Sequence, residues 1–172
     1  MRHNPDATTS LALLDTIITT TGSWNFNASA SLRYATQEDW STIDDPDDRL
    51  PRESLLAGAD VYLDAYGNRS ADAAGALAFG CQALEASVRT TCAKNLAGGG
   101  VGGSNSGTEG SETAPMVPVS SRRYVVDEER GGVSVLGISG PLRAPSSFEF
   151  RLERGRLRYV DLVVAIKELY VQ

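Results

Sequence analysis

The sequence predicts an α+β fold in which helices come first and an antiparallel sheet follows. Apolar residues recur at helical spacing between residues 52 and 66. The last third of the chain instead alternates polar and apolar residues in four runs separated by turn residues. With 172 residues, 41% of them hydrophobic and 22% charged, the chain suits one domain built on one core. An antiparallel meander with one face covering the helices satisfies all three observations.

Two amphipathic helices are expected before the sheet. The first covers residues 8–21, where leucine and isoleucine fall at helical spacing and Gly22 provides a stop. The second follows Pro51, which suits the first position of a helix, and covers residues 52–66. Asp60 lies at the border of the apolar stripe of this second helix. It is therefore a candidate acid.

Three further segments complete the organisation of the chain. Residues 23–40 carry aromatic side chains, including Tyr34 and Trp40, and are expected to fold back onto the core. Residues 71–86 are alanine-rich and fit either a short helix or a strand. Residues 97–120 are rich in Gly, Ser and Thr, so we expect a flexible insertion loop within a single domain.

The predicted strands cover residues 122–127, 133–138, 147–153 and 156–166. A two-residue loop at residues 154–155 would pair Leu152 with Leu157, Phe150 with Tyr159, and Phe148 with Asp161. This register places one carboxylate among apolar side chains on the inner face of the sheet. Burial disfavours the charged form, so Asp161 either finds a hydrogen-bond donor near solvent or titrates at a raised pKa, as a general acid or base would.

Charge and hydropathy exclude several classes of partner. Sixteen basic residues against 22 acidic residues give a net charge of −6, which repels nucleic acid and anionic lipid. No apolar run reaches the roughly 18 residues that a membrane span needs. We expect neither nucleic acid nor a membrane as a partner, and a cytoplasmic location because no signal peptide is visible.

Histidine and cysteine usage narrows the chemistry. His3 is the single histidine. The sequence therefore does not favour a mechanism that needs a histidine base, a histidine metal ligand or a Ser-His-Asp triad. Cys81 and Cys92 cannot form a zinc site alone and are either two thiols or one disulfide. A disulfide would need an oxidising compartment, and residues 27–29 and 68–70 match the N-x-S glycosylation triplet. Secretion is therefore the alternative location.

Four sequence segments resemble the SnoaL-like branch of the NTF2-like superfamily, and more narrowly a group of fungal domains of mostly unassigned function. The resemblance covers roughly residues 50–164, and the segments that carry it are Arg52-Glu53 with Tyr62-Leu63, residues 122–128 (RRYVVDE), residues 147–151 (SFEFR) and residues 155–160 (GRLRYV). It implies a cone-shaped fold with an internal cavity, often dimeric through the sheet. The fungal relatives often carry histidine at the positions of Phe148 and Asp161, and this chain has none there.

The resemblance implies a cofactor-independent enzyme of secondary metabolism that isomerises, cyclises or dehydrates a hydrophobic polyketide, terpenoid or alkaloid intermediate. We expect neither a metal nor an organic cofactor. We expect a homodimer that forms through the sheet. The candidate catalytic residues are Asp161, Asp60, Tyr159 and Arg123. The candidate substrate-binding residues are Tyr34, Tyr62, Tyr124, Phe148, Phe150 and Trp40. The alternatives are a non-catalytic binding or dimerisation module and a secreted, disulfide-stabilised protein.

Overall fold

The computed structural model describes residues 2–3, 11–13, 16–20, 26–68, 75–99, 118–140 and 143–165. Its helices are α1 (Ala28–Ala35), α2 (Arg52–Asn68) and α4 (Cys92–Lys94), with shorter turns η2 (Pro46–Asp48), η3 (Gly75–Ala78) and η4 (Asn95–Gly99). Its strands are β1 (Arg2–His3), β2 (Leu11–Leu13), β3 (Gln82–Glu85), β4 (Val88–Thr91), β5 (Ser120–Asp127), β6 (Gly132–Ser139), β7 (Ala144–Glu153) and β8 (Arg156–Val164). Helices and sheet together confirm the α+β class.

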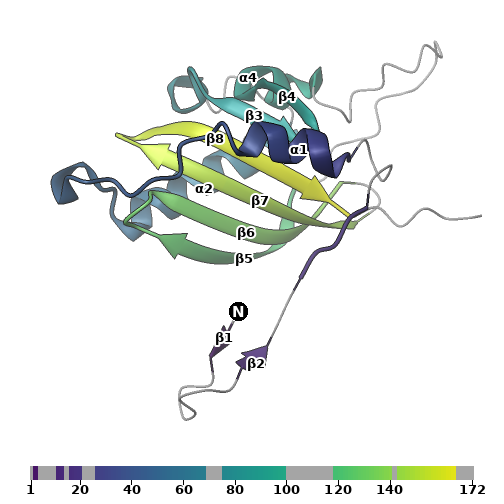
Figure 1. Ribbon diagram of the computed structural model, residues 1–172, viewed down its shortest axis with the longest axis horizontal. Helices are drawn as coiled ribbons and strands as arrows, with labels where there is room; N and C mark the ends of the chain where they lie inside the picture. Colours follow the sequence, from purple (N-terminus) through teal and green to yellow (C-terminus); the bar gives the residue numbers. More distant parts are fainter. Residues whose placement is uncertain are drawn as a thin grey trace, which may run out of the picture.

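Six strands form one curved sheet in the order β4-β3-β8-β7-β6-β5 (Figure 1). The strands β5 to β8 make the antiparallel meander that the sequence predicts, since each pairs with its neighbour in the chain. The β3–β4 hairpin extends this sheet, with β3 parallel to β8. The sequence left residues 71–86 undecided between a short helix and a strand. The structure has both there, since η3 is a short helical turn and β3 is a strand.

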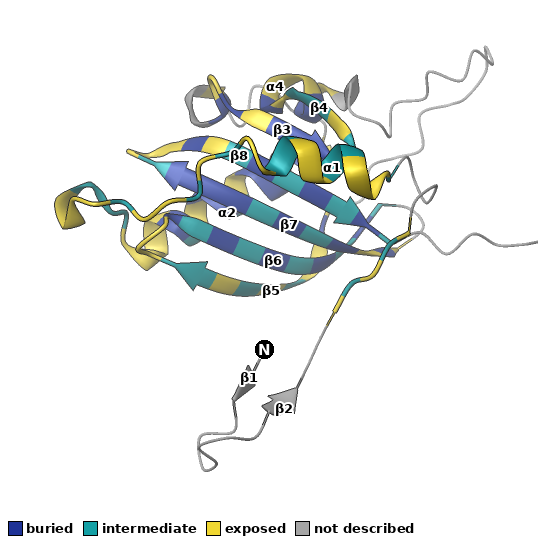
Figure 2. Ribbon diagram, in the orientation of Figure 1, coloured by how far each residue is buried: buried dark blue, intermediate teal, exposed yellow. Residues whose placement is uncertain are grey.

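The two longer helices lie on opposite faces of the sheet (Figure 1). We call the face that packs on α2 the inner face and the face under α1 the outer face. Phe148 and Phe150 of β7 are fully buried on the inner face and contact the rings of Tyr62 and Tyr66 from α2. Buried and partly exposed residues alternate along β6 and β7 (Figure 2), as expected for a sheet with one core face.

The register between β7 and β8 differs from the predicted one beyond the first two pairs. Glu153 faces Arg156 and Leu152 faces Leu157, as predicted, but Arg151 then faces Tyr159. Residue 158 is thus an extra residue on β8, a β-bulge, and bulges invert the alternation of side chains that follows.

Phe150 and Phe148 consequently face Val160 and Leu162, not Tyr159 and Asp161. Asp161 lies on the outer face opposite Glu149. The predicted placement of Tyr159 and Asp161 on the inner apolar face is therefore wrong.

The N-terminal prediction is also wrong where the structure describes it. Residues 11–13 form β2, paired with β1, and residues 16–20 have no regular structure. β-Branched residues, frequent in this segment, lose rotamer freedom in a helix and favour extended conformations. The rest of the predicted helix over 8–21 lies outside the described residues.

The remaining segment predictions have mixed outcomes. The second helix is confirmed as α2. Residues 26–40 contribute α1, which contacts β3 through Ser31 and the Ala86–Ser87 turn. Residues 97–99 belong to η4 and Val119 is buried beside β5, so the predicted loop 97–120 is too long at both ends. Its centre lies outside the described residues.

We expect Gly131→Ala to destabilise the fold much more than Gly155→Ala. Both glycines have positive φ, +60° and +73°, which costs an L-residue roughly 1–2 kcal/mol. Only at Gly131 would a Cβ also lie 2.2 Å from the Leu152 carbonyl oxygen; at Gly155 nothing lies within 4 Å. Urea unfolding should show a loss of about 3 kcal/mol or more for Gly131→Ala and about 1 kcal/mol for Gly155→Ala. Equal losses would contradict the close approach.

Candidate functional site

A strap, residues 36–45, follows α1 and crosses the outer face of the sheet (Figure 1). Arg151 of β7, only 2% exposed, donates to the Ser41 carbonyl oxygen at 2.6 Å and forms an ion pair with Glu153. The Ile43 amide donates to the Glu129 carbonyl at 2.8 Å. These bonds fix the strap against β7 and the β5–β6 turn, and they determine which strap side chains face the sheet.

The strap brings Glu38 onto Asp161 of β8. Each carboxyl group shifts the pKa of the other through a side-chain hydrogen bond, and two carboxyl groups can make such a bond only while one of them holds a proton. The Oδ1 atom of Asp161 is buried and has no hydrogen-bond partner. Glu38 of the strap and Asp161 of the sheet form what we call the carboxyl pair.

Burial and neighbouring charge distinguish the two members of the pair. Burial, followed by the charges of Glu38 and Glu149, raises the pKa of Asp161 to about 7. Burial also raises the pKa of Glu38, but hydrogen bonds from Trp40 and Asp161 and the charge of Arg89 oppose the rise. The hydrogen bond between the two groups raises the pKa of Asp161 and lowers that of Glu38, so Asp161 is the member of the pair that keeps the proton more strongly.

Glu149 and Arg89 complete the charges around the pair. Glu149 faces Asp161 across the β7–β8 ladder, and burial raises its pKa although the Ser134 hydroxyl donates to it at 2.7 Å. Arg89 of β4 donates to Gln37 at 3.0 Å and to Gln82, and it lowers the pKa of Asp161. The guanidinium of Arg89 thus favours the charged forms of both members of the carboxyl pair.

Three aromatic residues that the sequence singled out border the pair. The indole nitrogen of Trp40 donates to Glu38 at 3.0 Å, and the Trp40 ring lies 6.1 Å from that of Tyr159. The Tyr159 hydroxyl accepts from the Asp39 amide at 3.4 Å. Tyr34 of α1 lies under the guanidinium of Arg89, 5.8 Å from its ring centre. The site therefore combines a proton-sharing acid pair with partly exposed rings.

The other candidate acid, Asp60, lies in a separate cluster between α2 and β5. Its Oδ1 accepts from Arg122 at 2.6 Å and from the Tyr124 hydroxyl at 2.5 Å, and Arg122 also binds Asp64 at 2.5 Å. Arg122 faces α2, and Arg123, the next residue on β5, faces the opposite side of the sheet. Asp60 and Tyr124 therefore help dock α2 onto the sheet edge and do not lie beside Asp161.

Arg123 shares the outer face with Asp161 but not its neighbourhood. It lies on β5, three strands from β8, a separation of about 14 Å at ~4.8 Å per strand. Tyr62, Phe148 and Phe150 are fully buried on the inner face. Of the ten predicted site residues, the structure brings together Asp161, Tyr159, Tyr34 and Trp40, and separates the other six.

A buried polar network on the inner face was not predicted. Glu85 of β3, 2% exposed, accepts from Asn95 at 2.7 Å and from the Tyr66 hydroxyl at 3.2 Å. The Tyr62 hydroxyl donates to Asn95 at 2.6 Å, and burial, then the charge of Glu85, raises the pKa of Tyr62. Buried polar groups of this kind are satisfied by one another and fix the packing of α2 and η4 against β3.

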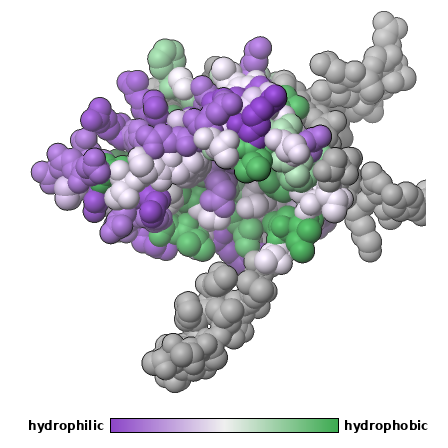
Figure 3. Space-filling model, in the orientation of Figure 1, coloured by the Kyte–Doolittle hydropathy of each residue, from purple (hydrophilic) through white to green (hydrophobic). Residues whose placement is uncertain are grey.

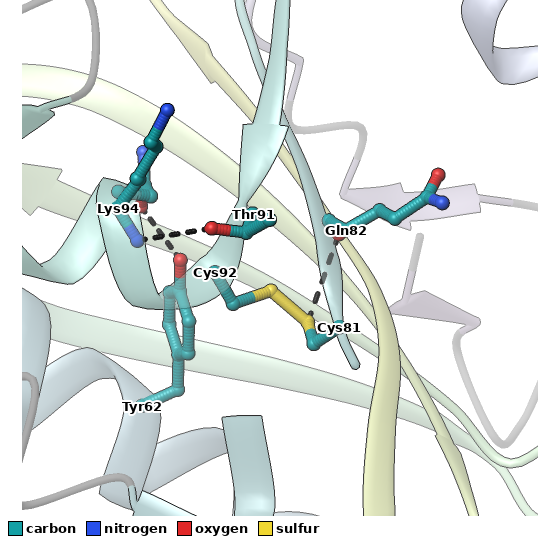
Figure 4. Close-up of a disulfide and its surroundings, with 7 residues drawn as sticks. Tyr62, Cys81, Gln82, Thr91, Cys92 and Lys94 are labelled. Carbon is teal, nitrogen blue, oxygen red and sulfur yellow. Dashed lines mark hydrogen bonds between the residues drawn. A yellow bond between two sulfur atoms is a disulfide. The ribbon is translucent and has the colours of Figure 1, made fainter. Parts of the chain in front are cut away.

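The disulfide Cys81–Cys92 lies beside this network (Figure 4). It joins the start of β3 to the start of α4, and both cysteines are buried. Thr91 caps the α4 turn by accepting from the Lys94 amide at 3.2 Å. The disulfide therefore holds the segment that carries Asn95 in place. Of the two alternatives that the sequence left open, two thiols or one disulfide, the structure has the disulfide.

Glu38 and Glu149 are the site residues that sequence reasoning did not select. Glu38 lies in a strap without periodicity, so no pattern predicts where its side chain points. Glu149 alternates with Phe148 and Phe150 along β7 and so faces away from the core, where periodicity alone assigns it no partner. Neither residue could be linked to Asp161 from the sequence, because the bulge that moves Asp161 to their side of the sheet was not predicted.

The described ranges contain no group of three or more His, Cys, Asp or Glu side chains arranged to hold a metal ion. Within those ranges, no helix has the length and apolar character needed to cross a bilayer. What the molecule presents is an α+β protein with an acid pair under a strap on the outer face of its sheet.

The chain matches the family described as "Domain of unknown function (DUF8021)" over residues 48–164. This is more than half of its length, and the chain belongs to that family. None of the curated proteins matches it. One solved structure, "Crystal structure of protein from Sphaerobacter thermophilus", is similar at 13% identity and a TM-score of 0.48, with 65% of this chain and 96% of that chain covered.

Asp161→Asn should flatten the dependence of stability on pH. With a pKa of about 7 in the folded state against an ordinary 3.8, Asp161 holds a proton that the unfolded chain releases. Its stabilisation is thus complete below about pH 4 and is lost as pH rises to about 7. Wild type should lose on the order of 3 kcal/mol across that window relative to Asp161→Asn. Urea unfolding at pH 4, 5, 6, 7 and 8 measures it.

The matched control for this prediction is Asp44→Asn, an exposed carboxyl group on the strap. We expect its profile to follow that of wild type. Parallel profiles for wild type and Asp161→Asn would mean that the pKa of Asp161 is the same in the folded and the unfolded protein.

Proposed function

We propose that the carboxyl pair Glu38–Asp161 is the acid–base centre of a cofactor-independent enzyme that acts on a small hydrophobic molecule. The observation that carries the proposal is the placement of Glu38 on the strap beside Asp161, whose buried Oδ1 has no hydrogen-bond partner, next to the rings of Trp40 and Tyr159. A protonated acid next to a carboxylate supplies donor and acceptor together, as isomerisation, cyclisation and dehydration require.

The two members of the pair would have different roles. Glu38, whose carboxylate receives the hydrogen bond of Trp40 and the charge of Arg89, would accept a proton from a carbon or hydroxyl group of the substrate. Asp161 would donate its proton to the oxygen on which negative charge develops. The rings of Trp40 and Tyr159 would contact the apolar part of the molecule. Each proton transfer of this kind contributes roughly 10²- to 10⁴-fold to rate.

The finer description of the fold and its substrates is part of the same proposal. A six-stranded curved sheet over α2 is compatible with a cone-shaped NTF2-like fold of the SnoaL-like type. The resemblance in sequence to that superfamily favours a polyketide, terpenoid or alkaloid intermediate of secondary metabolism as substrate. The site proposed here lies on the outer face of the sheet, not in the interior between sheet and α2.

Asp161→Asn should lower turnover about 10²- to 10³-fold. A suitable first probe is a β,γ-unsaturated ketone, whose isomerisation to the conjugated enone is followed by ultraviolet absorbance. Glu38→Gln should remove the acidic limb of the pH–rate profile, because its carboxylate must be ionised to act as base. In wild type the rate should fall above about pH 7, where Asp161 loses its proton.

The control for this assay is Asp60→Asn, in the separate cluster between α2 and β5. It should leave the pH–rate profile of turnover unchanged. Turnover that survives in Asp161→Asn would remove the proposed role of the pair, and the stability profile of that variant establishes independently that it is folded.

A second candidate function is a non-catalytic binding or dimerisation module. The observation that favours it is the filled interior: Phe148 and Phe150 are fully buried against Tyr62 and Tyr66, so aromatic rings occupy the space that a cone-shaped cavity would need. The outer face also carries Val125 of β5, which is 62% exposed. Figure 3 shows apolar side chains over the β5–β6 side of this face.

If the chain forms a homodimer through this face, Val125→Lys should shift it to monomer. A buried lysine in a self-complementary interface would face its own copy across the two-fold axis or lose its hydration. Sedimentation velocity at several concentrations measures the change. Val61→Lys, at a 42% exposed position on α2, is the control and should leave the oligomeric state unaltered.

For the location of the protein, we propose the secreted alternative over the cytoplasmic one. The disulfide Cys81–Cys92 favours it, because disulfides form and persist in oxidising compartments and are rare in the cytosol. Both sulfur atoms belong to buried residues, which is typical of a structural disulfide, not of a catalytic one.

A further inference from the structure

Two short sequence motifs have no part in the proposed acid–base chemistry. Asn27-Ala28-Ser29 precedes and enters α1, and Asn68-Arg69-Ser70 begins at the last residue of α2. Both have the N-x-S pattern of an N-glycosylation acceptor, and such acceptors lie on protein surfaces. Residues 27 to 29 are all exposed, and so is Asn68. Asn95, which is 6% exposed, lacks the pattern.

The atoms of Asn27 are divided in a way that suits this modification. Its side chain caps α1 through Oδ1, which accepts from the Ala30 amide at 3.0 Å. Its backbone amide donates to the Ser87 hydroxyl at 2.6 Å. A glycan attaches to Nδ2, which these bonds leave unused, and the glycosylated amide keeps Oδ1 as an acceptor. The helix cap and the glycan are therefore compatible.

The disulfide supplies an independent reason to expect the modification. Oxidative formation of Cys81–Cys92 requires a compartment of the secretory type, and N-glycosylation takes place along the same route. We infer that Asn27 and Asn68 are N-glycosylated. In each case Nδ2 attacks C1 of the first sugar of a lipid-linked oligosaccharide diphosphate. A C–N bond forms, the C1–O bond to the diphosphate breaks, and the amide nitrogen loses one proton.

The two positions lie away from the carboxyl pair. Asn27 is bonded to Ser87 in the β3–β4 turn, and α1, with 8 residues, separates it from the strap by about 12 Å at 1.5 Å per residue. Asn68 follows Gly67, which packs against Pro118 next to β5. Glycans at these positions would leave the strap accessible and would keep the start of α1 out of any subunit contact.

The test expresses the full chain in a eukaryotic secretory host and compares its mass before and after treatment with an amidase that removes N-glycans. We expect a loss of mass, with Asn27 and Asn68 both converted to aspartate in the peptide spectra. Ser29→Ala and Ser70→Ala should each remove one glycan while keeping the asparagine, and Ser29→Thr should retain it. The double variant Ser29→Ala with Ser70→Ala should carry none.

Formation of the Cys81–Cys92 disulfide is checked on the same material by the absence of free thiols. An unmodified Asn27 or Asn68 in secreted, disulfide-bonded protein would overturn the assignment at that position. A mass loss that persists in the double variant would overturn it as well, because the glycan would then lie elsewhere. Neither outcome depends on any catalytic activity.

Discussion

The single extra residue on β8 determines the surface chemistry of this protein. Arg158 lies between the pairs Leu152–Leu157 and Arg151–Tyr159, and every residue after it points to the face opposite the one that uninterrupted pairing would give. The bulge sends Val160 and Leu162 into the core and Asp161 out of it. Burial of those two apolar side chains, at roughly 1.5–3 kcal/mol each, holds the shifted register in place.

The outer face then has to accommodate two carboxyl groups at one place. A buried guanidinium makes this possible: Arg151 holds the strap at Ser41 and is itself held by Glu153. The strap so fixed covers Asp161 with Glu38. Negative charge on both Glu38 and Asp161 is disfavoured when the two groups are neighbours, and a proton retained on one of them relieves the repulsion. Structural anchoring and proton affinity therefore have one cause, the position of the strap on the sheet.

The sequence was sufficient for α2, the four-stranded meander and the turn at residues 154–155, because their periodicity and turn residues act locally. It was insufficient for the β7–β8 register beyond that turn, since a bulge leaves no periodic mark and one residue inverts a face. Asp161, Tyr159, Tyr34 and Trp40 were selected for their chemistry and do lie together. Glu38 was missed because a strap obtains its orientation from tertiary contacts alone.

β3 pairs in parallel with β8, although the two strands lie at distant points of the chain. The β3–β4 hairpin and its disulfide join neighbouring residues and can close early, but one edge of β3 has no partner until the C-terminal strand has been synthesised. Non-local pairing of this kind slows folding. During synthesis, an apolar strand edge with Ala83 and Leu84 stands open, and the interval before β8 arrives is when the nascent chain is most exposed to aggregation.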